Sequence, residues 1–112
     1  MDWQRPRSEA GPVVNEELSR AVVMFLRGSG LAWPRSSPEA VEREMGPEVA
    51  ERLLPRVRQL ADEAVYWPVD WQVHPDLDTA VPVVQAAITE AHPELNDAAV
   101  SALVWNFSYC NK

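Results

Sequence analysis

The sequence predicts an all-α protein: a compact bundle of four to six short helices preceded by a flexible N-terminal arm. Three observations support this fold class. Apolar residues recur at helical spacing in several segments, residues that favour helix starts stand directly before those segments, and no segment alternates long enough to form a strand. With 112 residues, 46% of them hydrophobic, the chain fits one helical domain over residues 13–112.

The first twelve residues form the expected arm. They carry Pro6, Gly11 and Pro12 among polar residues and show no helical periodicity. Such a segment has little to bury, so we expect residues 1–12 to be flexible. Trp3 is the exception, because the large apolar face of a tryptophan is usually packed against other groups.

The first helix is predicted from about Asn15 to Arg27. The Asn15 side chain can accept a hydrogen bond from the free backbone N–H groups of the first turn. Apolar residues follow on one stripe of the helix, namely Leu18, Val22, Phe25 and Leu26. Gly28 and Gly30 come next, and glycine tolerates the left-handed conformation that often ends a helix.

A short second helix is predicted to end at Gly46. Ser36 is the expected N-cap, Pro38 suits the first turn, and Glu39 stands where its side chain can reach back toward Ser36. The connector before this helix carries Trp33.

The third helix, from Pro47 to about Tyr66, has the clearest apolar periodicity in the chain. Pro55 lies inside it. An interior proline removes one backbone hydrogen bond and crowds the preceding turn. We therefore expect either a kink or a break into two helices near Leu54.

Two further helices follow an aromatic loop over residues 67–77. Asp78 is the expected cap of a helix over about 79–91, and Asn96 with Asp97 is expected to begin the last helix, which reaches Cys110. That last helix is apolar on two sides. Such a helix is either the buried centre of a bundle or half of an interface, so a homodimer through it is possible.

The formal net charge of −7 is unevenly distributed. From residue 69 onward there are six acidic residues and a single basic one, Lys112. Acidic surfaces repel phosphate backbones and attract basic proteins, so nucleic acid is not an expected ligand. The chain has no apolar run long enough for a membrane helix, no signal-peptide pattern and one cysteine, which together predict a cytoplasmic protein. Its Ala, Val, Arg and Trp usage is typical of high-GC bacterial proteins.

The aromatic loop supplies the main candidate site. Tryptophan is frequent in protein–protein interfaces because its rigid apolar body carries one N–H donor. Here tryptophans stand among carboxylates, a combination suited to a basic protein surface. The candidate partner-binding residues are Trp67, Asp70, Trp71, Asp76 and Asp78. We expect a small acidic protein-binding module, such as an inhibitor, an immunity-type protein or a regulatory adaptor.

Two alternatives come from other functional classes. A metal-assisted enzyme could use His74, Asp76 and His92, since imidazole and carboxylate are common metal ligands, although their spacing matches no standard motif. A helix-turn-helix-like DNA-associated regulator could use the arginines of the third helix. Those arginines are Arg52, Arg56 and Arg58, and they alternate with acidic residues.

Catalysis is not expected. Cys110 stands at the end of an acidic half of the chain, a setting that does not favour a thiolate. The sequence has neither a nucleophile-elbow pattern nor a glycine-rich phosphate loop, so no cofactor is predicted.

Overall fold

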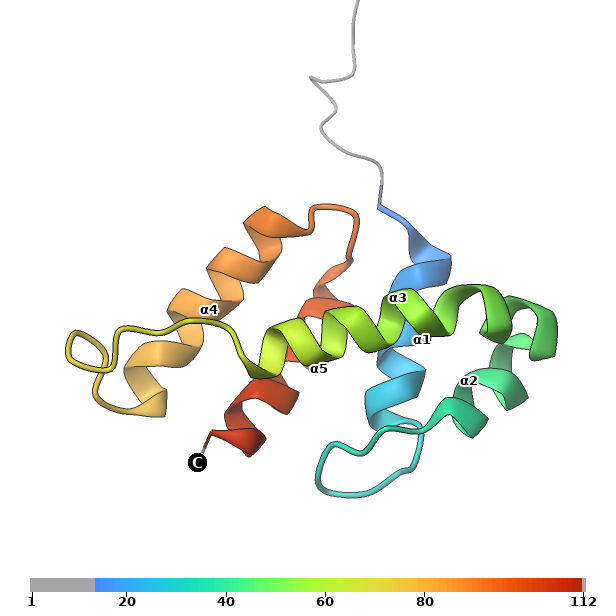
Figure 1. The fold of residues 1–112 in the computed structure, drawn as a ribbon, viewed down its shortest axis with the longest axis horizontal. Coiled ribbons are helices and arrows are strands. Elements are labelled where there is room, and N and C mark those ends of the chain that lie inside the picture. Colours follow the sequence, from blue (N-terminus) through green and yellow to red (C-terminus); the bar gives the residue numbers. More distant parts are fainter. Residues whose placement is uncertain (1–13, 112) are drawn as a thin grey trace, which may run out of the picture.

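The computed structural model describes residues 14–111, so the expected arm over residues 1–12 and Trp3 lie outside the described part. Within that part the fold is all-helical and contains no strand, which confirms the predicted fold class (Figure 1). The five helices are α1 (Glu16–Arg27), α2 (Pro38–Met45), α3 (Pro47–Val65), α4 (Leu77–Ala91) and α5 (Asp97–Cys110). None of them is long and apolar enough to cross a membrane.

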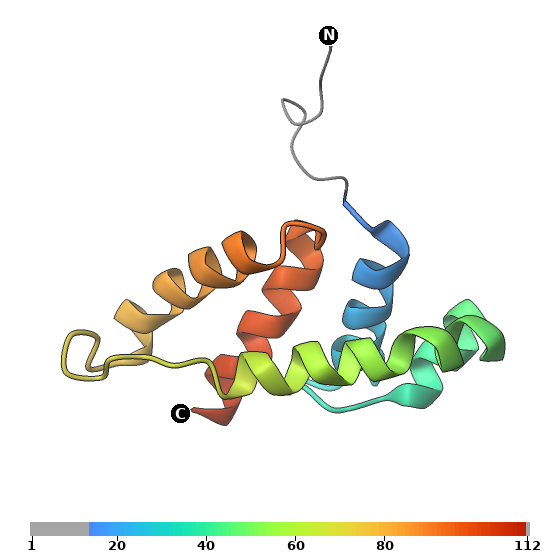
Figure 2. The ribbon, with the colours of Figure 1, turned by 45° about the horizontal axis from the view of Figure 1, so that its top comes forward.

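Helix α5 is the centre of the bundle. It packs against α1, α3 and α4, while α2 closes the far end against α1 and α3. Figure 2 shows α4, α5 and α1 in a row, with α3 crossing α5 and α1. Phe107, Leu103 and Ala102 of α5 are almost completely buried in the common core. One apolar side of α5 is therefore covered within the chain, whereas Ala98 and Tyr109 on its other side are exposed. The homodimer that the sequence allows through this helix stays untested.

Side-chain caps begin two helices where the sequence predicted them. Asn15 Oδ1 accepts from the backbone N–H of Leu18 at 3.0 Å, and Asn96 Oδ1 accepts from that of Ala99 at 2.9 Å. In each case the cap satisfies an N–H group that has no partner inside its helix. Pro47 begins α3, also as expected.

The start of α2 differs from the prediction by one residue. Ser37, not Ser36, is the N-cap, and its hydroxyl donates to the carbonyl of Arg35 at 3.2 Å instead of capping the helix. The expected capping box between Ser36 and Glu39 is therefore wrong. The Ser37 side chain is buried, so its hydroxyl takes the acceptor available inside the protein.

The end of α1 depends on glycine for a reason other than the expected one. Gly28 has an ordinary right-handed conformation, and the positive φ of 74° falls on Gly30. A Cβ atom on Gly28 would clash with the carbonyl oxygen of Met24 and with the Cβ of Ala40. Glycine is thus required at position 28 because α1 and α2 approach each other closely there.

Helix α3 continues through Pro55, so the expected break does not occur. The proline removes the hydrogen bond that the carbonyl of Glu51 would otherwise accept. Both Pro55 and Glu51 are exposed, and water can solvate that carbonyl. A proline on the solvent side of a long helix can therefore be tolerated.

Helix α4 begins two residues earlier than predicted. Asp76, not Asp78, is the N-cap, and its Oδ1 accepts from the N–H of Thr79 at 3.0 Å. Pro82 consequently lies beyond the first turn. It is exposed, as Pro55 is, so the carbonyl it leaves without a helical partner lies on the solvent side.

Two hydrogen bonds join the beginning of α1 to the turn before α5. The backbone N–H of Asn15 donates to the carbonyl of Glu94 at 2.7 Å, and the N–H of Asn96 donates to the hydroxyl of Ser19 at 2.9 Å. Ser19 is completely buried, so its hydroxyl has a specific protein partner. These bonds fix the turn between α4 and α5 on the body of the protein.

Candidate functional site

An open cleft of about 530 Å³ lies between the start of α4 and the end of α5. It is lined by residues of the loop before α4, of the first turn of α4, and of the C-cap of α5. The lining residues are Trp71, Pro75, Asp76, Leu77, Asp78 and Asn111. Three of the five candidate partner-binding residues, Trp71, Asp76 and Asp78, therefore lie around one cleft.

The Trp71 side chain forms one wall of this cleft and packs against Phe107 on its other side. Its ring is parallel to that of Phe107 in α5, with an interplanar angle of 1° and 6.5 Å between the centroids. Phe107 is buried, whereas Trp71 is 42% exposed. An offset parallel arrangement is favourable for aromatic pairs, so the core positions an indole that is still partly open to solvent.

Asp70 shapes the loop but does not line the cleft. Its Oδ1 accepts from the N–H of Gln72 at 3.0 Å, and its carbonyl accepts from the N–H of His74 at 2.8 Å. A side chain that bonds to the backbone two residues ahead stabilises a tight turn. Asp70 thus supports the conformation that presents Trp71.

Trp67 is also outside the cleft. Its side chain is half-buried and packs against the core at the end of α3. Spacing in the sequence could not separate Trp67 from Trp71, because the direction of each ring depends on the turn between them.

The two aspartates of the cleft have different surroundings. Asp76 uses one carboxylate oxygen as the cap of α4. Asp78 lies in the first turn, and within residues 14–111 its carboxylate has no hydrogen bond or ion pair. Both side chains are exposed, and both lie near the positive end of the α4 dipole, where a negative charge is stabilising.

Sequence reasoning missed Asn111 as a cleft residue. Its side chain donates to the carbonyls of Val65 and Phe107, at 3.2 and 2.9 Å, and so joins the ends of α3 and α5. The signal was available, since asparagine is common just after a helix. Its proximity to the loop before α4, however, depends on tertiary packing.

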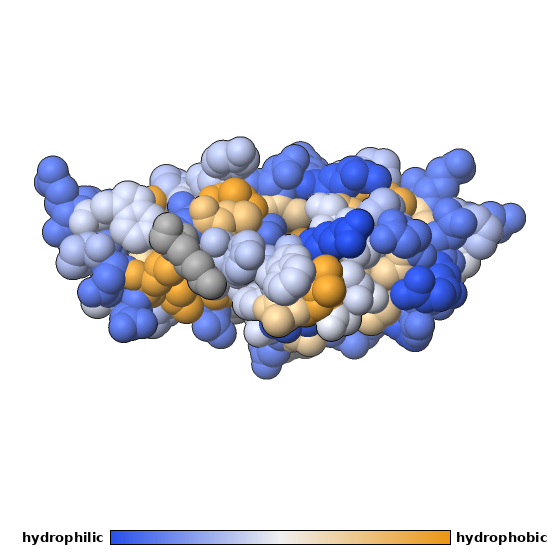
Figure 3. Space-filling model, turned by 90° about the horizontal axis from the view of Figure 1, so that it is seen from below, coloured by the Kyte–Doolittle hydropathy of each residue, from blue (hydrophilic) through white to orange (hydrophobic). Residues whose placement is uncertain are grey.

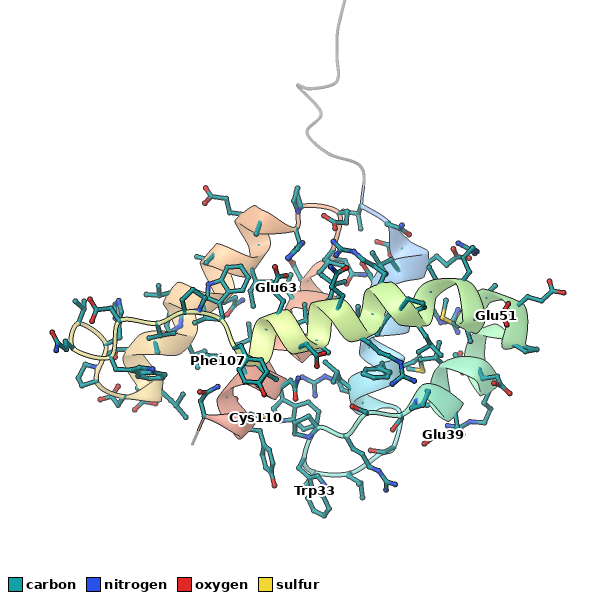
Figure 4. All side chains as sticks on the ribbon, in the orientation of Figure 1. Trp33, Glu39, Glu51, Glu63, Phe107 and Cys110 are labelled. Atoms are coloured by element: carbon teal, nitrogen blue, oxygen red, sulfur yellow. The ribbon has the colours of Figure 1, made fainter. Side chains whose placement is uncertain are left out.

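The residues of the metal hypothesis are not brought together. His74 precedes α4 and His92 follows it, and a helix of 15 residues separates the two by roughly 20 Å. His92 instead contacts Glu63, with 2.5 Å between Nε2 and the carboxylate (Figure 4 labels Glu63). Among the described residues there is no group of three or more His, Cys, Asp or Glu side chains that could hold a metal ion.

The arginines of the DNA hypothesis all have partners within the chain. Arg52 pairs with Glu17 at 2.9 Å, and Arg56 contacts Glu94 at 3.5 Å. The guanidinium of Arg58 lies 5.6 Å from the centre of the Phe25 ring. They therefore do not form a free basic face on α3.

Figure 3 shows several separate apolar patches with polar and charged residues between them. Trp33, which Figure 4 labels at the tip of the connector between α1 and α2, is exposed on its own. The cleft beside Trp71 is distinguished by combining an aromatic ring with carboxylates.

Comparison of the chain with protein-family models, curated proteins and solved structures gives no match.

Proposed function

We propose that the protein is a binding module without a catalytic role, and that the cleft beside Trp71 contacts a basic side chain of a partner protein. One observation carries this proposal. The cleft combines a partly exposed indole with the carboxylates of Asp76 and Asp78, and no lining residue among those described is positively charged.

An arginine side chain suits such a cleft. Its planar guanidinium can lie on the face of Trp71, a contact that contributes about 0.5–1 kcal/mol at an exposed site. It can also donate to the carboxylate of Asp78, and an exposed ion pair contributes about 0.2–1 kcal/mol. Each contact is weak, so useful affinity requires that several basic residues of the partner engage the acidic half of the chain together.

The net charge of that half supports the same partner class. From residue 69 onward the formal charge is −5, from six acidic residues and Lys112. A negative field of this kind raises the association rate of a basic protein and is screened by salt. Binding that weakens steeply between low and physiological ionic strength is therefore expected.

A short blocked arginine peptide provides a defined first test. We expect Trp71→Ala to weaken its binding about twofold to fivefold and Asp78→Asn to weaken it by up to about fivefold, as measured by heteronuclear NMR titration. Asp78 is a better target than Asp76, because changing Asp76 would also remove the cap of α4.

Asp97→Asn is the matched control. Asp97 is also an exposed aspartate in the first turn of a helix, but it does not line the cleft. If Asp97→Asn weakens binding as much as Asp78→Asn, the peptide responds to net charge alone and the cleft is not the site. If only Asp78→Asn weakens binding, affinity capture from a cell lysate identifies the natural partner as the protein that the wild-type chain and Asp97→Asn retain and Asp78→Asn loses.

A further inference from the structure

A second, smaller cleft lies on another part of the molecule and shares no residue with the first. It has a volume of about 280 Å³ and is formed where α1, α3 and the end of α5 meet. Figure 4 labels Cys110, which lies at its rim near the end of α5. Phe25 and Val65 supply apolar lining, and Arg58, Asp62 and Asn106 supply polar groups.

Asn106 is the unusual residue of this cleft. It is on the inner part of α5, and only 9% of it is exposed. Its Oδ1 accepts a weak hydrogen bond from the Cys110 thiol at 3.8 Å, and within residues 14–111 its Nδ2 donates to no protein group. A buried donor without a partner costs about 1–3 kcal/mol, so an amide held in this way calls for an acceptor from outside the chain.

The charged groups define which acceptor fits. Arg58 lies over the Phe25 ring at one side of the cleft, and Asp62 stands one turn further along α3. Together they bring one positive and one negative charge, so the lining is neutral overall. A ligand carboxylate would be attracted by Arg58 and repelled by Asp62, and a ligand ammonium the reverse. Neither charge therefore gains a net attraction to offset the hydration that it loses in the cleft.

We propose that this cleft binds a neutral amide group attached to a small apolar body. The amide carbonyl accepts from Nδ2 of Asn106, the amide N–H donates to the Asp62 carboxylate, and the apolar body contacts Phe25 and Val65. The volume is at the small end of the range for ligand pockets, which fits a ligand the size of one blocked amino acid.

N-acetyl-leucinamide is the probe that tests this proposal on the wild-type chain. We expect a saturable shift of the Asn106 side-chain NH₂ signals in NMR, with a dissociation constant on the order of 1 mM. The same probe should slow the alkylation of Cys110, the lone cysteine, because the occupied cleft covers its rim.

Two charged analogues of the probe test the neutral character of the site. N-acetyl-leucine carries a carboxylate and leucinamide carries an ammonium, and each should bind at least about threefold more weakly than the neutral amide. Tighter binding of either charged analogue would overturn the proposal, since the site would then recognise charge. A blocked tripeptide distinguishes two sources of the amide: tighter binding than the single residue indicates a peptide segment, and equal binding indicates a small molecule.

Asn106→Leu removes the donor while keeping a side chain of similar shape. It should weaken N-acetyl-leucinamide binding about threefold to tenfold. Gln85→Leu is the matched control, because it removes an exposed carboxamide of α4 that does not line the cleft, and it should leave binding unchanged.

Asp62→Asn keeps the proposal testable if the Asn106 variant does not fold. Asp62 is exposed, and an asparagine there can still accept from the ligand. The neutral amide should keep its affinity within about threefold, while the penalty against N-acetyl-leucine should disappear. An Asn106 signal that does not shift up to the solubility limit of the probe would overturn the proposal and leave water as the partner of Nδ2.

Discussion

Helices α4 and α5 are similar in length and composition but occupy very different positions. They have 15 and 14 residues, and both are rich in alanine and valine. Seven residues of α5 are buried, against three in α4. The reason is the packing: α5 lies between three other helices, whereas α4 rests on α5 by a single face.

This difference separates two tasks in one small bundle. The central helix provides stability, and the outer helix presents its first turn and the preceding loop to solvent. The cleft beside Trp71 lies where the two helices meet. The Trp71 ring rests on Phe107 of the central helix α5, whereas the carboxylates of Asp76 and Asp78 stand at the start of the outer helix α4. The following predictions test that separation.

Truncating one buried aliphatic side chain in each helix should give the largest effect. Leu103 of α5 and Ile88 of α4 are each 1% exposed. Leu103→Ala should lower the free energy of unfolding by about 3–5 kcal/mol. Ile88→Ala should lower it by about 2–3 kcal/mol, because α4 can shift and fill part of the cavity that the substitution leaves. Urea denaturation measures both. Equal losses would mean that α4 is held as rigidly as α5.

Hydrogen exchange should show that α4 opens separately. The backbone amides of residues 84–91 should exchange with an opening free energy at least about 1 kcal/mol below that of α5, because fewer contacts hold α4 in place. The amides of α1 are the internal reference, since α1 packs against three helices. If all three helices exchange with the same free energy, the bundle opens only as one unit.

The cap of α4 should give a smaller effect. Asp76→Ala removes the side-chain bond to Thr79 and should lower the free energy of unfolding by about 1 kcal/mol. Asp78→Ala should change it by less than about 0.5 kcal/mol, because Asp78 is exposed and has no partner among the described residues. Thermal denaturation of the two variants distinguishes capping from charge. A larger loss for Asp78→Ala would reverse the assignment of the cap.

The fold was predictable from sequence where the signals are local. Asn15 and Asn96 each supply a cap to the helix that follows directly, so their roles can be read from neighbouring residues. The errors have non-local causes. Tertiary packing buries Ser37, whose hydroxyl bonds to the carbonyl of Arg35 instead of the helix start, and α3 continues through Pro55 because that residue faces solvent.

The candidate site was predictable only in part, for a similar reason. Trp71, Asp76 and Asp78 are close in sequence, and a turn followed by a helix start brings them around one cleft. The inward position of Trp67 and the contribution of Asn111 depend on where α3 and α5 end relative to each other. The second cleft draws its residues from three helices and leaves no pattern in the sequence.

The position of α5 has a consequence for how the chain is made. A ribosome synthesises α1 well before α5, yet Ser19 of α1 receives its hydrogen bond from Asn96, which is 77 residues later in the chain. Helices α1 to α3 therefore emerge without the helix that fills the space between them. Their apolar faces stay uncovered until α5 has been translated, so the common core can assemble only after that point.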